Sequence, residues 1–217
     1  MSVLITGANR GIGRALFDIY RARGVPLTGT MRGDPPGPDW RRLDVTDPAS
    51  QRDLAVSLDG APLDLLICNA GVYLDKGESL ATGYPPAMWA DAFAVNVTGV
   101  FLTVQALLPR LEAAATPRIA IISSQMASHT RAPGGSYIYR ASKAAALNLG
   151  RNLATDLRPR GVAVGIYHPG WVRTDMGGGA ADLPVDEAAR GLAARFDELS
   201  LDKTGCFETW DGRAHAY

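Results

Sequence analysis

VLITGANRGIG, residues Val3–Gly13, determines the architecture expected for this chain. An uncharged run at its start predicts a buried strand, and a pattern of helical spacing begins at Ile12, directly after the glycines. Glycines let a chain turn sharply and let its backbone approach a pyrophosphate, while the free N–H groups at a helix start attract phosphates. A strand, a glycine turn and a helix within the first 24 residues therefore predict a dinucleotide-binding site.

Short apolar runs alternate with longer segments of helical period along the remaining chain. Parallel pairing is expected because crossovers of this length span a sheet, and uncharged strands indicate that both sheet faces are covered. We expect one domain, residues 1–217, with an α/β Rossmann fold and a doubly wound, mostly parallel seven-stranded sheet between helices. The expected strands are 3–6, 26–30, 40–45, 63–69, 118–123, 162–167 and 206–210, and the expected helices are 12–23, 48–58, 86–115, 139–157 and 186–196.

Two local signals refine the helices. Asp47 is a plausible N-cap for the helix over 48–58. Pro109 should bend or break the long helix over 86–115, because proline lacks the N–H that a helix interior needs.

Composition excludes several classes of protein. Apolar residues make up 47% of the 217 residues and charged residues 20%, which predicts a globular chain rather than a disordered one. Lys and Arg total 22 and balance 22 Asp and Glu, so neither nucleic acid nor an anionic membrane surface is an expected partner. The sequence contains no run of about 18 apolar residues, so no membrane span is predicted. Met1 and Ser2 lead straight into the first strand and leave no room for a signal peptide.

The cysteines and histidines give no covalent or metal framework. Cys68 and Cys206 are too few for a disulfide scaffold and fit a reducing compartment, so we expect a cytoplasmic protein. His129, His168 and His215 are far apart and lack the paired spacing of metal ligands. No metal site is predicted.

Further motifs follow the glycine turn in order. The turn has the spacing T-G-x-x-x-G-x-G, and the later motifs are Leu43-Asp44-Val45, Asn69-Ala70-Gly71, Asn96, Ser123-Ser124, Tyr139-x-x-x-Lys143 and Pro169-Gly170. Over nearly the whole chain this set resembles the short-chain dehydrogenase/reductase family. The segments 123–128, 134–143, 168–176 and 207–212 are similar to its C-factor-like, carbonyl reductase branch.

The resemblance implies a nicotinamide dinucleotide held along the strand ends. Asp44 and Val45 would contact the adenine, Asn69 to Gly71 the ribose, and 169–174 the nicotinamide end. The expected cofactor-binding residues are Gly7, Asn9, Arg10, Gly11, Ile12, Gly13, Arg32, Asp44, Val45, Asn69, Ala70, Gly71, Tyr139, Lys143, Pro169, Gly170, Val172 and Thr174.

The end of the second strand indicates which dinucleotide binds. An NAD enzyme places a carboxylate there for the ribose hydroxyls, whereas an NADP enzyme uses cations for the 2′-phosphate. By spacing from Thr6 this position is Met31, Arg32 follows it, and Arg10 lies on the same side. Two guanidinium groups favour NADP(H) over NAD(H). Asp34 is the open alternative, because a small loop shift would bring it towards the ribose.

Tyr139 and Lys143 form the expected catalytic pair. They are four residues apart on a helix, which places their Cβ atoms about 5–6 Å apart on one face. A neighbouring ammonium and an oxidised nicotinamide would favour the phenolate, and moving a tyrosine pKa from about 10 to about 7 needs roughly 4 kcal/mol. Tyr139 would donate a proton to a carbonyl oxygen as hydride arrives. Lys143 would also reach the nicotinamide ribose, as the resemblance implies.

Two other polar residues complete the expected catalytic set. Ser124 would hydrogen-bond the substrate oxygen and stabilise its developing charge. Asn96 would anchor a water that connects Lys143 to solvent.

One departure from the family concerns spacing. Ser124 and Tyr139 are fifteen apart, two more than usual. Tyr137 stands at the usual spacing, but the residue four beyond it is Ala141, which is no cation. We therefore place the two extra residues in the loop over 125–136.

The expected function is NADPH-dependent reduction of a carbonyl compound. The residues expected around the nicotinamide include Gln125, Met126, Tyr137 and Trp171. They are mostly apolar or aromatic, which suits a neutral ketone or aldehyde. Two alternatives stay open: a nucleotide-binding, C-factor-like signalling protein with little turnover, and an NAD-dependent alcohol dehydrogenase. Apolar residues at 144, 145, 147 and 149 also suggest a homodimer formed between helices.

Overall fold

Seven short strands form one sheet in the computed structural model, which describes residues 1–217. They are β1 (Val3–Ile5), β2 (Leu27–Met31), β3 (Trp40–Arg42), β4 (Leu65–Cys68), β5 (Arg118–Ile122), β6 (Ala163–His168) and β7 (Phe207–Thr209). All neighbours pair in parallel in the order β3-β2-β1-β4-β5-β6-β7, and the order reverses between β1 and β4. The expected Rossmann fold is confirmed, and the reversal marks the crevice where such sheets bind ligands.

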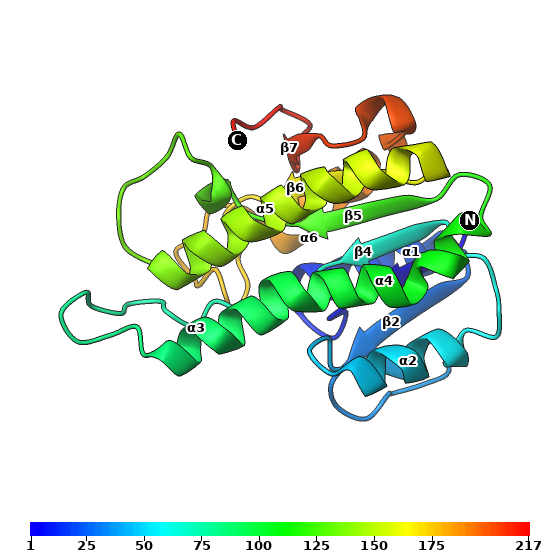
Figure 1. Cartoon of the computed structure of the whole chain (residues 1–217), viewed down its shortest axis with the longest axis horizontal. Helices are drawn as coiled ribbons and strands as arrows, with labels where there is room; N and C mark the ends of the chain where they lie inside the picture. Colours follow the sequence, from blue (N-terminus) through cyan, green and yellow to red (C-terminus); the bar gives the residue numbers. More distant parts are fainter.

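Helices cover both faces of the sheet (Figure 1). They are α1 (Gly11–Ala22), α2 (Pro48–Ser57), α3 (Pro86–Phe93), α4 (Gly99–Glu112), α5 (Tyr137–Leu157) and α6 (Val185–Glu198). Helices α2, α4 and α5 lie on one face, and α1 and α6 lie on the other. Each face has its own buried cluster, one around Leu66 and Leu107 and the other around Ile5 and Phe196. Burial on both sides explains why the central strands are mostly apolar, with Arg118 at the start of β5 as the charged exception.

The long helical stretch differs from expectation at Pro109. The helix continues through Pro109 to Glu112. Pro109 and Gln105, four residues before it, are both exposed, so water can bond the carbonyl that the missing N–H leaves free. The interruption lies instead at Ala94–Thr98, a π-helical turn between α3 and α4.

The stretch Pro86–Glu112 has the length and hydropathy of a membrane-spanning helix. In the fold it packs on the sheet instead. Val100, Val104, Leu107 and Leu111 are all buried in the core cluster beside β4 and β5. It is therefore a core helix of this domain.

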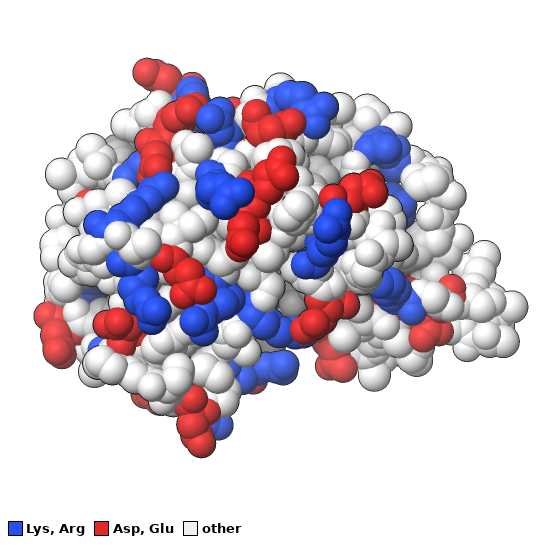
Figure 2. Space-filling model, turned by 180° about the vertical axis from the view of Figure 1, so that it is seen from behind, with Lys and Arg blue, Asp and Glu red and all other residues white.

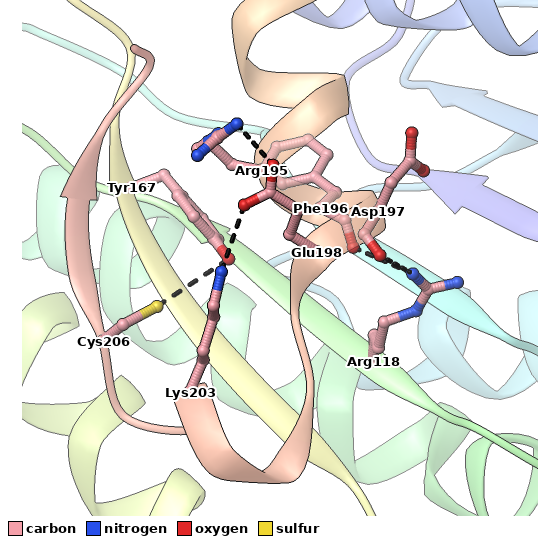
Figure 3. A network of polar contacts seen from close by, with 8 residues as sticks. All are labelled: Arg118, Tyr167, Arg195, Phe196, Asp197, Glu198, Lys203 and Cys206. Carbon is pink, nitrogen blue, oxygen red and sulfur yellow. Dashed lines mark hydrogen bonds and ion pairs between the residues drawn. The ribbon is translucent and has the colours of Figure 1, made fainter. Parts of the chain in front are cut away.

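Arg118, the first residue of β5, holds the C-terminal end of α6 (Figure 3). Its Nη1 donates to the carbonyl oxygens of Phe196 and Asp197, each at 3.0 Å. A helix end leaves such carbonyls unpaired, and a cation there complements the helix dipole. Glu198, the last residue of α6, pairs with Arg195 and Lys203 in the same network. These contacts anchor α6 at the edge of the sheet opposite the glycine turn.

The face formed by α1 and α6 carries both signs of charge intermingled (Figure 2). Arg14 pairs with Asp18 at 2.8 Å within α1, and Arg23 pairs with Asp197 at 2.9 Å between the two helices. Interspersed charges of this kind form a solvated, salt-bridged surface rather than a field of one sign.

The outer face of α5 is polar, contrary to expectation. Leu147 is buried with Ile166 and Phe207, and Leu149 packs against the main cluster on that side of the sheet. The residues exposed on this helix include Asn148, Arg151, Asn152 and Thr155. The apolar residues of α5 serve the core of this chain, so the argument for a dimer from an apolar α5 surface is wrong.

Candidate active site

The glycine turn joins β1 to α1 at the carboxyl edge of the sheet. Gly7 and Gly11 have φ angles of +64° and +54°, which glycine adopts without strain. A Cβ at Gly13 would collide with the Asn69 side chain and the Gly7 carbonyl. Helix α1 has no side-chain cap and no acidic residue in its first turn. Its first N–H groups are thus available to a phosphate, and the turn fits the pyrophosphate of a dinucleotide.

Asn69 ties this turn to β4. Its Nδ2 donates to the carbonyl oxygens of Thr6 and Gly7 at 2.9 and 3.0 Å. The main-chain N–H groups of Asn69 and Ala70 both donate to Thr6 Oγ1 at 3.0 Å. The motif at 69–71 therefore closes the edge of the sheet exactly where β1 and β4 end side by side.

A cleft of about 790 Å³ runs along this edge. Most of the expected cofactor residues line it: Gly7, Asn9, Arg10, Gly11, Ile12, Gly13, Arg32, Asp44, Val45, Asn69, Ala70, Gly71, Tyr139, Lys143, Pro169 and Thr174. Four expected site residues lie outside that lining: Asn96, Ser124, Gly170 and Val172. The cleft is also lined by residues that were not expected, among them Asp91, Ala94, Val95, Asp175 and Met176. Asp91, Ala94 and Val95 lie just before Asn96 in the sequence, and Asp175 and Met176 lie just after Thr174. This closeness to expected site residues is the signal that could have identified them.

Gly170 and Val172 do not line the cleft themselves, but they lie in the segment between Pro169 and Thr174, which do. Gly170 has a φ of +89°, and a Cβ there would press on Leu183 and Trp210. Val172 is buried and pairs with Leu183 in an isolated β-bridge. Both residues position the segment that carries Thr174.

Tyr139 and Lys143 lie on the inward side of α5, where they are 8% and 5% exposed. Lys143 Nζ donates to the Ile122 carbonyl at 2.9 Å and lies 5.8 Å from the centre of the Tyr139 ring. Tyr137 is 39% exposed, so Tyr139 is the tyrosine of this helix that lines the cleft. Helix α5 begins at Tyr137, so the two extra residues expected between Ser124 and Tyr139 would lie in the loop before it.

Burial dominates the titration of both groups. It raises the pKa of Tyr139 to about 12, opposed by a hydrogen bond with the Ser124 side chain. It lowers the pKa of Lys143 to about 8. The expected lowering of the Tyr139 pKa depended on an oxidised nicotinamide as well as Lys143, whereas in the protein alone the loss of water dominates. At neutral pH the protein's own environment keeps Tyr139 a phenol, which is the form that donates a proton.

Ser124 and Asn96 approach this pair from two sides. Ser124 Oγ accepts the Met126 N–H at 3.1 Å as the cap of the 3-10 turn Gln125–Ala127, which leaves its hydroxyl proton for another acceptor. Asn96 lies in the π turn, and its Nδ2 donates to the Val72 carbonyl and to Ser142 Oγ, both at 2.9 Å. Asn96 therefore ties the loop after β4 to α5.

The two expected phosphate-binding cations follow the carboxyl ends of β1 and β2 in the chain. Arg10 and Arg32 are exposed and line the cleft, whereas Asp34 is not among its lining residues. Arg10 Nη1 also pairs with Asp175 Oδ2 at 3.1 Å. The arrangement offers positive charge where the second strand ends.

Known proteins match this chain in sequence and structure. The short chain dehydrogenase family model matches residues 39–182. C-signal of Myxococcus xanthus is 39% identical over 163 residues, which covers 74% of this chain and 96% of that protein. The NADPH-bound carbonyl reductase from chicken fatty liver has a TM-score of 0.90 at 33% identity, covering 100% of this chain and 98% of that one. Carbonyl reductase Sniffer of D. melanogaster has a TM-score of 0.92 at 26% identity, covering 100% and 99%.

The sheet, the glycine turn and the cleft together define a Rossmann-fold oxidoreductase. The chain belongs to the short-chain dehydrogenase/reductase family, in the branch that contains the carbonyl reductases.

Proposed function

We propose that this protein is an NADPH-dependent carbonyl reductase that converts a neutral ketone or aldehyde to an alcohol. The observation that carries the proposal is that Tyr139 and Lys143 line the same cleft as the glycine turn. The bound cofactor would supply the hydride. The chain would supply the proton, the orientation of the substrate and the exclusion of water.

The proposed roles follow from the contacts of each group. Tyr139 donates its phenolic proton to the substrate oxygen, and Ser124 hydrogen-bonds the same oxygen. Lys143, held by the Ile122 carbonyl, supports the proton donor and binds the nicotinamide ribose. Asn96 has both amide protons in use, so a water on this residue would bind its main-chain carbonyl, which a π turn can leave without a partner.

The remaining cofactor contacts are proposed from their place along the cleft. Asp44 and Val45 contact the adenine, and the residues at 69–71 line the ribose. Pro169, Thr174 and the supporting Gly170 and Val172 hold the nicotinamide end. Leu74 and Met176 leave apolar side chains partly exposed along the cleft, which supports a neutral substrate.

Preference for NADPH rests on Arg10 and Arg32. Replacing Arg32 by Ala is expected to raise the Kd for NADPH by about 10–100-fold, because a charge-assisted bond to a phosphate contributes about 1.5–3 kcal/mol. The Kd for NADH should change less than about threefold. Fluorescence titration with both nucleotides measures this. Arg42→Ala is the matched control, since Arg42 is an exposed arginine on the neighbouring strand that does not line the cleft. Equal weakening of both nucleotides would refute the phosphate contact.

A signalling role is the second candidate, because the protein is 39% identical to C-signal over 163 residues. A panel of aromatic and aliphatic aldehydes and ketones, with NADPH oxidation followed by absorbance, separates the two. Turnover of any neutral carbonyl compound supports the reductase. Tight NADPH binding with no turnover of the whole panel would favour the nucleotide-binding signalling protein.

Assembly and location are proposed from the surface and the cysteines. A homodimer would use α4, where Phe101 is 43% exposed, and sedimentation velocity would give the mass. Cys68 and Cys206 are both free thiols, which suits a reducing cytoplasm.

A further inference from the structure

Helix α5 begins without a cap of its own. Ser136 precedes it with a φ of +48°, and its side chain makes no hydrogen bond to the helix. The Ser136 hydroxyl bonds instead with the hydroxyl of Tyr73. The first N–H groups of a helix have no acceptor within the helix, so α5 needs one from elsewhere in the chain.

Asp75 supplies that acceptor from the loop after β4. Its Oδ2 accepts the Ile138 N–H at 2.8 Å, and its Oδ1 accepts the Tyr139 N–H at 3.2 Å. The carboxylate is 1% exposed, and these two N–H groups are its hydrogen-bond donors. A carboxylate at a helix start also complements the positive end of the dipole. Buried charge of this kind persists only where its partners hold it, so the contact is specific.

The same loop contacts the Tyr139 ring. Tyr73 stacks on it with 4.2 Å between ring centres and 22° between planes. Tyr73 and Asp75 therefore contact both the side chain and the main chain of Tyr139. Their loop begins at the Asn69 to Gly71 motif, which lines the cofactor cleft.

We propose that Asp75 is a positioning residue that caps α5 from outside the helix and sets the place of the Tyr139 hydroxyl in the cleft, with Tyr73 as its partner on the ring. The proposal rests on the reductase function for its kinetic consequences. Rotation or fraying of the first turn of α5 would displace the phenol, and a misplacement of about 1 Å can cost about 100-fold in rate.

The charge of Asp75 can be separated from its role as an acceptor. The groups that face the Tyr139 phenol are Lys143 on its own helix, Tyr73 and Asp75 on the loop, and Ser124 after β5. Asp75 and Tyr73 both add to the raised pKa of Tyr139. Asp75→Asn keeps an oxygen acceptor and removes the charge, whereas Asp75→Ala removes both.

The test compares the two variants with NADPH and a carbonyl compound that the parent protein reduces. Asp75→Ala is expected to lower kcat at least 30-fold with the NADPH Kd within about threefold of the parent. Asp75→Asn should retain kcat within about fivefold and move the pH profile of kcat towards lower pH. Asp47→Ala is the matched control, because Asp47 caps α2 through the Ala49 and Ser50 N–H groups and should leave kcat unchanged.

Amide hydrogen exchange by NMR tests the cap without any turnover. Exchange at Ile138 and Tyr139 should be at least 100-fold faster in Asp75→Ala and near the parent rate in Asp75→Asn. If the parent reduces no carbonyl compound, the reductase proposal fails and exchange alone decides the cap. If Asp75→Ala does not fold, Asp75→Asn decides it through exchange and kcat.

Three results would overturn the proposal. The first is a kcat within threefold of the parent in Asp75→Ala. The second is unchanged exchange at Ile138 and Tyr139 in that variant. The third is that both variants lose kcat equally while the Ile138 and Tyr139 amides stay protected in Asp75→Asn. The loss of kcat would then be caused by removal of the negative charge and not by loss of the cap.

Discussion

Replacing Tyr139 by Phe is expected to lower kcat by about 100- to 10,000-fold, the range that general acid catalysis contributes. The substitution removes one hydroxyl and keeps a buried ring that can still stack on Tyr73. Burial holds the Tyr139 pKa near 12, so the lost group is a protonated phenol at neutral pH. Since the phenyl ring preserves packing, the Kd for NADPH should stay within about threefold. Stopped-flow hydride transfer and fluorescence titration measure the two quantities.

Tyr137→Phe is the matched control for this experiment. Tyr137 lies two residues earlier on the same helix and is 39% exposed. Contrary to the expectation that it shapes the substrate site, it does not line the cleft, so its variant should keep the parent rate. A Tyr139→Phe protein that binds NADPH and retains the parent kcat would remove Tyr139 from the mechanism. A loss of NADPH binding equal to the loss of rate would instead assign Tyr139 to cofactor affinity.

Local rules predicted the fold and most of the cleft. The central strands were short and mostly apolar, and the glycines had to stand where the chain turns and packs closely, as at Gly13. Helical spacing alone put Tyr139 and Lys143 on one face, and the structure places both in the cleft. Periodicity is a property of the sequence itself, which is why these features could be predicted.

Features that depend on distant contacts could not be predicted. Pro109 is tolerated because Pro109 and Gln105 are both exposed to water, and the π turn that contains Asn96 is tied to the loop after β4. The cap from Asp75 joins residues 63 apart in the sequence. The raised pKa of Tyr139 in the protein alone could not be predicted for the same reason, because burial depends on the whole fold.

Lys143 is expected to reduce stability while serving catalysis. Its buried ammonium has one hydrogen-bond acceptor, the Ile122 carbonyl, and burial lowers its pKa from 10.5 to about 8. That fall corresponds to about 3 kcal/mol at 1.36 kcal/mol per pH unit. Losing the bond to Ile122 would offset about 1 kcal/mol. Lys143→Met should therefore raise the free energy of unfolding at pH 7 by about 1–2 kcal/mol and lower kcat/KM at least 100-fold.

The pH dependence identifies the cause. Between pH 8 and about 10 the unfolded chain keeps the Lys143 proton that the folded protein has released, so the contribution of Lys143 to the parent's stability rises with pH across this window. Below pH 8 both states hold the proton and the cost is constant. The raised pKa values of Cys68 and Cys206 act in the opposite direction above about pH 9, and that of Tyr139 above about pH 10, but the parent and the variant share all three groups. Lys143→Met lacks the rise, so its advantage should shrink to near zero by about pH 9.5 in urea unfolding.

A second lysine separates burial from charge. Lys203 is exposed and pairs with Glu198 at 3.1 Å, so Lys203→Met should change the free energy of unfolding by less than about 0.5 kcal/mol at either pH. If Lys143→Met is less stable than the parent at pH 7, the ammonium is better solvated or bonded than its surroundings indicate. If the gain persists unchanged at pH 9.5, it comes from packing of the methionine rather than from the buried charge. Only a gain that disappears with deprotonation assigns the instability to the ammonium group that we propose for catalysis.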